Sequence, residues 1–540
     1  MLSYRKLAMR VLGRPLHTGG NDSPRPASQR AAAFILTAAM LITLTAPAFA
    51  DTWCIENGDI TVKAGDTKGT NKVSQGDKKD VEDTNTIITN QKTDKASSNT
   101  VTIEANGKND KVEVTLKDVN IDASSRNNAA VSVTGSCNTT IKLDGDNALK
   151  SDTYRSGIAS TGSLTISGGE NDSLTAQGGS GANGISSSGS LTISGGTVTA
   201  TGGNSTGIVG YGGSGIYSSS GVAISGGAVT ANGGDSKDGY GGNGIYSSSG
   251  VAISGGTVKA AGGNGKDGYG GNGISSTSTT ISGGTVTANG GSGNSSGGNG
   301  IRSNGVTISG GTVNANGGSG KNGNGGSGII GSGRVAISGG KVAATGGDGG
   351  NGKDGGDGIY SSVIDLSGSL ELTAKAGSPN GKALSRAGSE LELDTIKDKL
   401  GPGAKVTVTD ADGKVNQVSI PRPVEPEESS SSSDGGSSAP SAPASPLPGL
   451  TVTDKSGAVI SYTSTQSGNT LTVCVGRLTA SFRISLAALR QLRAEGIETI
   501  TFQTILCSTT LSVDELLAMG GEDAEAVLTH RLTDSSLTVG

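Results

Sequence analysis

The phrase Ile-Ser-Gly-Gly recurs seven times along the middle of the chain and constrains its fold more than any other feature. Successive copies begin 27 to 31 residues apart, at Ile166, Ile193, Ile224, Ile253, Ile281, Ile308 and Ile337. A second phrase, Gly-Ile, comes seven or eight residues before each copy, so most of the variation in length falls in the Gly-rich stretch that follows. A period of this size is typical of solenoids, in which each repeat forms one coil and stacks on the next.

One repeat, residues 244–263, shows the local pattern. Three short runs, Ile245–Ser247, Val251–Ile253 and Thr257–Ala260, alternate in side-chain type, which predicts strands with one buried face. The Gly-Gly pairs between them permit sharp turns, and the runs are too short and too glycine-rich for helices. A single repeat cannot bury its few Ile and Val side chains alone. The sequence therefore predicts a mainly all-β fold, a three-sided parallel β-helix of about ten coils.

The glycine content could also indicate disorder. Glycine accounts for 94 of the 540 residues, while 3% of the residues are aromatic and 16% are charged. Gly-rich chains without a three-residue period are often disordered. The constant phase of the Ile and Val residues argues against disorder here, because an unfolded chain does not need to keep it.

Composition changes along the chain predict its domain organisation. The predicted segments are a signal peptide (1–50), an N-terminal cap with irregular first coils (51–156), regular β-helix repeats (157–376), closing strands with a C-terminal cap (377–420), a Pro/Ser-rich linker (421–450) and a small α+β domain (451–540). In the C-terminal cap, strands are expected at 391–393 and 406–408. In the last domain, strands are expected at 471–475 and 499–506, and Ser-capped helices at 485–492 and 512–520.

The first 50 residues have the features of a secretion signal. A basic start precedes an apolar run at 31–44, and Ala48-Phe49-Ala50 is a small-x-small cleavage site before Asp51. The apolar run is short for a membrane span, although a retained signal-anchor is the alternative. Cleavage would leave 36 basic and 46 acidic residues, a net charge of −10, with no transmembrane segment. This acidic balance argues against a nucleic-acid partner, and the expected location is secreted or on a bacterial cell surface.

Four cysteines are consistent with disulfides in an exported protein, namely Cys54, Cys137, Cys474 and Cys507. Two bridges, each within one part of the chain, are one interpretation, and Cys474 with Cys507 is the more plausible pair. Free buried thiols are the other interpretation. None of the spacings resembles a zinc site.

Residues 53–376 carry a family resemblance, based on 114–121 (Val-Thr-Leu-Lys-Asp-Val-Asn-Ile), 140–147 (Thr-Ile-Lys-Leu-Asp-Gly-Asp-Asn) and the Gly-Ile and Ile-Ser-Gly-Gly-Thr-Val phrases. This part of the chain resembles the bacterial cell-surface proteins described as carbohydrate-binding-domain-containing, of the right-handed parallel β-helix type. The resemblance implies binding of plant or other polysaccharides at the bacterial surface, with calcium in some members.

Five tyrosines confined to three successive coils are the predicted ligand-binding residues: Tyr211, Tyr217, Tyr240, Tyr246 and Tyr269. Tyr217 and Tyr246 occupy the same position after Gly-Ile, so stacked coils would place them roughly 5 Å apart. Exposed aromatic rings in a row can hold sugar rings by apolar contact, which predicts a polysaccharide or a host or cell-wall glycan as partner. The alternative is that these rings only pack over neighbouring glycines.

The Gly-rich loops contain candidate calcium ligands. Residues 262–269 match the calcium-binding nonapeptide pattern of β-rolls once, and residues 233–238 nearly match it. The candidate ligands are Asp235, Asp238, Asp267, Asp348, Asp354 and Asp357. Calcium needs six to eight oxygen ligands, which neighbouring loops could supply together. Solvated Gly/Asp loops are the alternative, because Lys237, Lys266 and Lys353 bring opposing charge.

Catalysis has little support in the sequence. The two histidines are His17, in the signal, and His530, so the repeats have no histidine for Ser-His or Cys-His chemistry. The prediction is therefore an adhesin-like protein that binds polysaccharide through the side of a β-helix, without catalysis. A structural stalk or protein-interaction module is the first alternative, and a polysaccharide lyase-like enzyme is the second.

Overall fold

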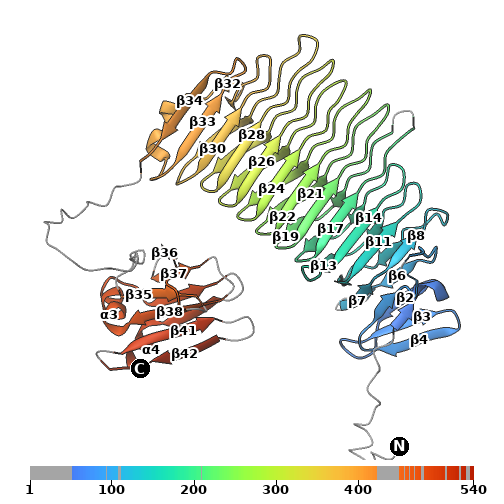
Figure 1. The fold of residues 1–540 in the computed structure, drawn as a ribbon, viewed down its shortest axis with the longest axis horizontal. Coiled ribbons are helices and arrows are strands. Elements are labelled where there is room, and N and C mark those ends of the chain that lie inside the picture. The colour runs from blue at the N-terminus through green and yellow to red at the C-terminus, as the bar shows by residue number, and fades with distance from the viewer. Residues whose placement is uncertain are drawn as a thin grey trace, which may run out of the picture. The chain divides into compact units, whose positions relative to one another are not determined.

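The computed structural model divides into two compact units, residues 1–425 and 426–540, which are described separately (Figure 1). The residues that the structure describes are 52–92, 94–106, 111–207, 210–421, 449–454, 457–460, 462–467, 469–475, 479–504, 508–521, 524–530 and 535–539. The predicted signal peptide and residues 422–448 of the predicted linker lie outside them.

The Thr-Val runs of the repeats form one parallel sheet, called here the Thr-Val sheet (Figure 1). Val198, Val229 and Val258 lie in register in adjacent strands, and each is buried. Within the described residues the sheet has 12 strands, and all are parallel except β34, which closes it. The strands are β8 (Asn120–Asp122), β11 (Asp146–Lys150), β14 (Ser173–Gln177), β17 (Thr197–Thr201), β20 (Ala228–Asn232), β22 (Thr257–Ala261), β24 (Thr285–Asn289), β26 (Thr312–Asn316), β28 (Lys341–Thr345), β30 (Glu371–Lys375), β33 (Lys405–Thr409) and β34 (Val415–Ser419).

The other two strand series of the solenoid belong to a second sheet, the isoleucine sheet. In the early coils the Gly-Ile strands are β6 (Val101–Glu104), β9 (Val131–Thr134), β12 (Ile158–Ser160), β15 (Ile185–Ser187) and β18 (Ile216–Ser218). The Ile-Ser-Gly-Gly series comprises β5 (Ile87–Thr89), β7 (Lys111–Lys117), β10 (Asn138–Asp144), β13 (Leu164–Ser167), β16 (Leu191–Ile193) and β19 (Val222–Ile224). The later coils contain β21 (Ile245–Ile253), β23 (Ile274–Ile281), β25 (Ile301–Ile308), β27 (Ile329–Ile337) and β29 (Ile359–Leu366).

The prediction of three separate strands in residues 244–263 is therefore wrong in one respect. The first two predicted strands are the single strand β21, which pairs with both β18 and β19 of the preceding coil. Between β18 and β19, Gly221 has a φ of 130°, a left-handed conformation that interrupts the strand. Gly250 at the equivalent position stays in the extended strand, with only a register irregularity between Ser247 and Gly250.

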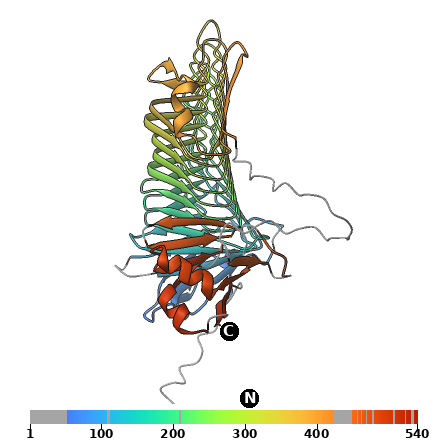
Figure 2. The same ribbon diagram turned by 90° about the vertical axis from the view of Figure 1, so that its left-hand side faces the viewer.

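The core consists of columns of identical residues stacked along the solenoid. Ile245, Ile274, Ile301 and Ile329 lie in register in adjacent strands and have an exposed fraction of 0%. The solenoid has about 13 turns, more than the ten predicted. The ordered coils include the segment predicted to hold the irregular first coils, where β6 and β9 already pair in parallel register. Figure 2 shows the coils stacked on one another.

The backbone conformation explains why the last residue of the phrase Ile-Ser-Gly-Gly is glycine. In six successive copies this residue has a φ between 74° and 78°, a left-handed conformation that glycine adopts without a Cβ clash. These residues turn the chain from the isoleucine sheet into the Thr-Val sheet: Gly196, Gly227, Gly256, Gly284, Gly311 and Gly340.

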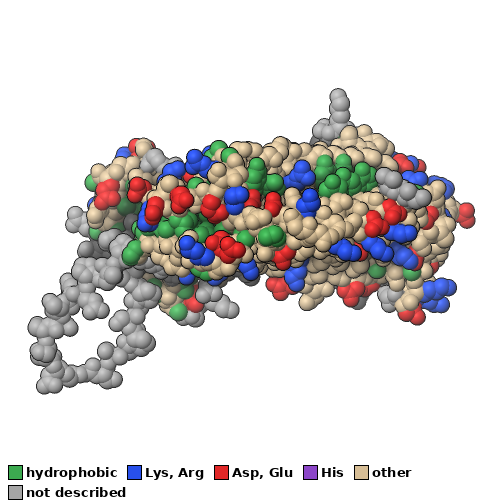
Figure 3. Space-filling view, turned by 90° about the horizontal axis from the view of Figure 1, so that it is seen from above, with side chains coloured by type: hydrophobic (Ala, Val, Ile, Leu, Met, Phe, Trp, Pro, Cys, Tyr) green, Lys and Arg blue, Asp and Glu red, His purple; other side chains and the backbone are tan. Residues whose placement is uncertain are grey.

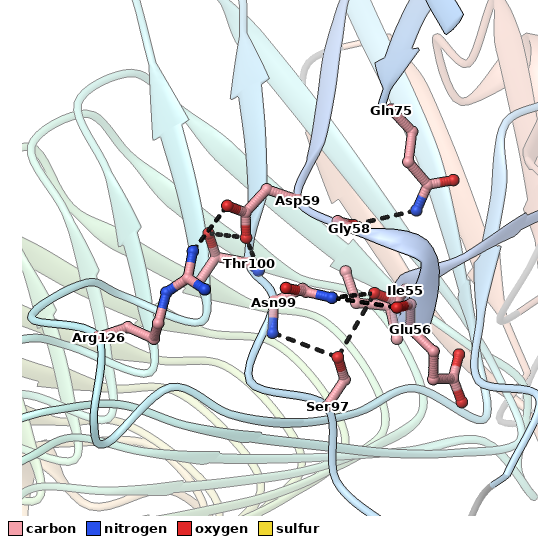
Figure 4. Close-up of polar contacts among 9 residues, drawn as sticks. All are labelled: Ile55, Glu56, Gly58, Asp59, Gln75, Ser97, Asn99, Thr100 and Arg126. Carbon is pink, nitrogen blue, oxygen red and sulfur yellow. Dashed lines mark hydrogen bonds and ion pairs between the residues drawn. The ribbon is translucent and has the colours of Figure 1, made fainter. Parts of the chain in front are cut away.

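An antiparallel meander covers the N-terminal end of the solenoid. It consists of β2 (Ile60–Ala64), β3 (Asn71–Gln75) and β4 (Lys78–Asp83), preceded by β1 (Thr52–Cys54) and the 3₁₀ turn η1 (Ile55–Asn57). The buried Trp53 donates a hydrogen bond from Nε1 to Asp83, over 2.8 Å. Asp59 accepts from Arg126, and Asn99 donates to the carbonyl of Ile55, which fixes the cap to the first coils (Figure 4). The open strands at this end are thereby covered.

The C-terminal end of the solenoid is covered by β31 (Leu384–Arg386), β32 (Ser389–Glu390), the 3₁₀ helix η2 (Leu393–Lys399) and the β33–β34 hairpin. The expected strand at 406–408 lies within β33. The strand expected at 391–393 is not present. The preceding strand, β32, ends at Glu390, and the 3₁₀ helix η2 begins at Leu393. Leu391 is buried and lies between the two elements.

Charged side chains on the outer faces pair between adjacent coils. Lys117 contacts Asp144 at 2.7 Å, and Lys150 contacts Asp122 at 3.0 Å. Figure 3 shows Lys/Arg and Asp/Glu side chains interspersed over one face of the molecule. Exposed pairs of this kind contribute roughly 0–1 kcal/mol each, so the buried columns dominate the stability.

The second unit contains two four-stranded sheets and two helices in its described residues. The strands are β35 (Leu450–Thr453), β38 (Ala480–Ser485), β41 (Glu525–His530) and β42 (Ser535–Val539) in one sheet, and β36 (Thr463–Ser467), β37 (Thr470–Cys474), β39 (Thr499–Gln503) and β40 (Ser508–Ser512) in the other. As expected, Ser485 caps α3 (Leu486–Ala494) and Ser512 caps α4 (Val513–Ala518).

The helices in the part of the chain that the structure describes all lack the length and apolar character of a membrane span.

The structure does not contain a Cys54–Cys137 disulfide, since Cys54 is a free thiol. Cys54 lies in register with Asp144, three strands away, whereas Cys137 precedes Asp144 by seven residues. That offset is about 20 Å along the strand, far beyond the reach of a disulfide. Cys474 is also a free thiol, 3.4 Å from Oε1 of Gln503, and Cys507 lies outside the described residues.

Candidate ligand-binding groove

The predicted tyrosines lie on one repeated backbone segment of the coils. In its clearest form, residues 240–246, the segment reads Tyr-Gly-Gly-Asn-Gly-Ile-Tyr and ends in strand β21. Equivalent segments of adjacent coils stack in parallel, because Gly212 N donates to the carbonyl of Tyr240 and Gly241 N donates to that of Tyr269, each over 2.9 Å. One coil therefore presents two outward side chains, six residues apart, on either side of a glycine-rich strip.

The five tyrosines form two separate stacks. In the outer stack, the ring centroids of Tyr211 and Tyr240 are 5.2 Å apart and those of Tyr240 and Tyr269 are 4.8 Å apart. In the sheet stack, the centroids of Tyr217 and Tyr246 are 5.4 Å apart. The outer rings are 44–61% exposed, and the sheet rings are half-buried. The sheet stack thus has the spacing predicted from the sequence, and the outer stack is a second one.

An asparagine ladder runs between the two tyrosine stacks. Asn243 Oδ1 accepts from both the backbone N–H and the side-chain amide of Asn272, each over 3.0 Å. Asn272 Oδ1 accepts the same two bonds from Asn299, each over 2.9 Å. The ladder therefore fixes the strip between the stacks through the side chains as well as through the backbone.

Together these elements enclose a groove of about 490 Å³ along the side of the solenoid. Its walls are the two tyrosine stacks, and its floor is the glycine strip with the asparagine ladder. At the end nearer the C-terminus it extends past the tyrosines to Ser296 and Arg302. Among the described residues that line it, Arg302 is the only charged one, and none is Asp, Glu, His or Cys.

Glycine pairs position the groove by holding the base of each Gly-rich loop together. Gly242 N donates to the carbonyl of Gly234, and Gly263 N donates to that of Gly242, both over 2.8 Å. Gly271 N in turn donates to Gly263, so the bonds zigzag from coil to coil; this chain of bonds is called the glycine zipper. A Cβ on Gly242 would lie 1.9 Å from the carbonyl oxygen of Gly213, so only glycine fits there.

The Gly-rich loops are therefore stacked rather than independent. Ser205, Ser236, Gly265 and Gly293 form parallel bridges with one another in successive coils. The differences in length between repeats fall in these loops, as predicted. The order within them was missed, although the paired Gly-Gly steps at both ends of each loop are visible in the sequence.

The six aspartates predicted as calcium ligands are spread over several loops. Among the described residues, no three or more His, Cys, Asp or Glu side chains form a group that could hold a metal ion. Asp235 accepts from the backbone N–H of Asn264 over 2.6 Å, and Asp348 accepts from that of Ser378 over 3.0 Å. Asp354 accepts from the side chain of Asn380, while Asp238 is half-buried and Asp267 exposed. Calcium binding stays a prediction.

Asp357 takes the place of an asparagine in the ladder position of its coil, and its Oδ1 accepts from the backbone N–H of Lys382 over 2.8 Å. Burial raises the pKa of Asp357 above its ordinary value of 3.8, partly offset by that hydrogen bond. The folded state therefore disfavours the ionised carboxylate, a penalty that is present at neutral pH and is lost as the pH falls towards 3.8.

Asp357→Asn is expected to raise the free energy of unfolding at pH 7, since the amide oxygen keeps the hydrogen bond without the buried charge. At about pH 3.5 the two proteins should unfold at similar denaturant concentrations, because the carboxyl group is then mostly protonated in both states. Urea titrations at both pH values measure this. A variant that is less stable than the native protein at pH 7 would contradict the expectation.

A family model described as Beta helix repeat matches residues 191–216, 280–300 and 306–329. No curated protein and no solved structure matches the chain. The matched repeats and the parallel coils in register define the class: this is a parallel β-helix protein with a small C-terminal α+β unit.

Proposed function

We propose that the protein binds polysaccharide through the tyrosine groove, without catalysis, as an adhesin-like protein that is secreted or carried on a bacterial cell surface. The observation that supports this most strongly is the groove itself, with its two stacks of partly exposed tyrosines. The resemblance to cell-surface carbohydrate-binding β-helix proteins and the predicted signal peptide support the same proposal.

The groove has the chemistry that a glycan chain requires. Tyrosine combines an apolar ring with a hydroxyl group, which suits ligands that have both apolar faces and hydroxyl groups. The glycine floor allows the ligand to approach the backbone closely. The lining residues come from four successive coils, so the groove is about 15 Å long from first to last coil, which suits several linked units of a polymer.

The lining residues do not support hydrolysis of the glycosidase type. Glycosidases use a pair of carboxyl groups on either side of the scissile bond. The groove has no carboxylate among its described lining residues, which favours binding over hydrolysis. Tyrosine can act as a general base, so the lyase-like alternative is tested by a search for shortened polysaccharide products.

Tyr217→Ala combined with Tyr246→Ala is expected to weaken glycan binding about 5- to 30-fold. Each substitution removes apolar ring surface that a ligand would cover, a loss of about 1–2 kcal/mol in total. A glycan array with the full chain identifies ligands, and calorimetry then compares the dissociation constants of the native protein and the variant.

Tyr360→Ala is the matched control. Tyr360 occupies the same column of the isoleucine sheet, in register with Ile330 and half-buried, but it does not line the groove. Its replacement should leave affinity unchanged. Equal affinities for the native protein and the double variant would place any bound glycan elsewhere.

Repeating the measurement in EDTA tests the calcium prediction. If calcium is bound, the glycan affinity or the stability of the protein should be lower in EDTA.

A structural stalk or protein-interaction module is the second candidate. The glycine zipper and the asparagine ladder add bonds between coils, as a spacer that must stay straight would need. If the native protein binds no glycan, this alternative is favoured. If shortened polysaccharide products appear, the protein is instead a polysaccharide lyase-like enzyme.

A further inference from the structure

The stacking of the tyrosines covers most of their ring faces. Planes within a stack differ by only 9–19°, with centroids about 5 Å apart, so neighbouring rings face each other along the solenoid. A ligand in the middle of the groove meets ring edges and hydroxyl groups. An uncovered face is left where a stack ends, and sugar rings pack best on such faces.

Both stacks end within the groove, at its end nearer the C-terminus. Tyr269 is followed in the next coil by Ser296, with which it forms a parallel bridge. Tyr246 is followed by Ser275, its partner in the adjacent strand. Serine is too small to cover a phenol ring, so one face of Tyr269 borders the extension of the groove over Gly297, Gly298 and Asn299, and one face of Tyr246 is left open beside Ser275, one coil earlier.

A single positive charge lies at this end. Arg302 is in the column of Tyr246, one coil beyond Ser275, and its side chain is exposed and lines the groove. Among the described residues, no carboxylate lies within ion-pair distance of Arg302, in contrast to Lys117, which contacts Asp144 at 2.7 Å. An arginine without a carboxylate partner, in a chain whose formal net charge is −5, favours an anionic group on the ligand.

The floor adds hydrogen-bond donors beside the arginine. A side-chain amide has two N–H donors, and the ladder uses one from Asn272 and one from Asn299. The second N–H of each half-buried amide is available to a ligand in the groove. Guanidinium and amide donors on one side of an open phenol face suit a sugar ring that carries a carboxylate.

We propose that this end of the groove is a subsite for an acidic sugar, in which Arg302 binds the carboxylate of a hexuronic acid residue and the open faces of Tyr246 and Tyr269 contact the ring. The inference rests on the proposed polysaccharide function and specifies its ligand class. A nucleic acid is a poorer candidate, because one cation cannot neutralise a series of phosphates.

The test measures binding of the full chain, in buffer with EDTA, to polygalacturonate, alginate and hyaluronan and to carboxyl-reduced forms of the same three polymers. Carboxyl reduction replaces each carboxylate with a primary alcohol and leaves the sugar ring intact. The native protein should bind at least one acidic polymer about tenfold more tightly than its reduced form. Arg302→Gln should remove that difference by weakening binding to the acidic polymer.

Lys259→Gln is the matched control, because Lys259 is an exposed cation on the Thr-Val sheet, away from the groove. It should keep the preference for the acidic polymer. Equal binding of the native protein to the acidic and the reduced forms would overturn the acidic subsite and leave the proposed function intact. An unchanged preference in Arg302→Gln would also overturn it. Failure of all six polymers to bind would overturn the acidic subsite, and the glycan array would then decide whether the proposed function also fails.

Discussion

Gly242→Ala is expected to lower the free energy of unfolding of the solenoid by about 3 kcal/mol or more. The new Cβ would lie 1.9 Å from the carbonyl oxygen of Gly213, which is backbone and cannot rotate away. Relief requires the stacked segments of two adjacent coils, at Gly213 and Gly242, to separate. That movement breaks bonds of the glycine zipper, in which Gly242 both donates to Gly234 and accepts from Gly263.

Gly305→Ala is the control for this substitution. Gly305 lies in strand β25, and an added Cβ there would meet no atom within 4 Å. Alanine should be neutral or stabilising at this position by up to about 1 kcal/mol, because it reduces the entropy of the unfolded chain. Guanidinium unfolding followed by circular dichroism compares both variants with the native protein. Equal midpoints for the two variants would show that the loop bases are not close-packed.

Ile329→Ala is expected to cost about 2–5 kcal/mol, because it leaves a cavity in a column that cannot collapse around it. Ile329 is fully buried and is stacked between Ile301 and Ile359. The backbones above and below are fixed by parallel strand pairing. The measurement is the shift in the denaturant concentration at the unfolding midpoint. The dependence of the free energy of unfolding on denaturant concentration should stay unchanged.

Ile330→Ala provides a control of the same residue type at the next position. Ile330 points to the opposite side of β27 and is half-buried, so its loss should cost about 1 kcal/mol or less. Comparing the losses in free energy of unfolding of Ile329→Ala and Ile330→Ala tests which face of β27 packs in the core. If Ile330→Ala were the more damaging substitution, the register of the isoleucine sheet would be wrong.

The coiled fold was predictable because the sequence repeats the residues that stack. Val198, Val229 and Val258 recur at the repeat period and stand next to one another in the structure. The union of two predicted strands into β21 was not predictable. It depends on whether Gly221 or Gly250 adopts a left-handed conformation, and glycine permits both.

The candidate site was predictable in part. Tyr217 and Tyr246 share a position in the repeat, so their contact followed from the period. The groove between the two stacks was not predictable, because it depends on the path of the loop between Tyr240 and the sheet. Arg302 was missed for a similar reason. Its significance comes from the coil two turns earlier, where Tyr246 occupies the same column.

The caps at the two ends of the solenoid differ from the repeats, and the repeats differ little from one another. Every internal coil offers the same bonding edge to the coil before it and to the coil after it, as the pairing of β24, β26 and β28 shows. A whole repeat added or removed between residues 303 and 358 would therefore change the length of the solenoid while preserving every interface. The residues that line the groove all precede this region. The length of the solenoid and the recognition of a ligand can therefore vary independently in such a protein.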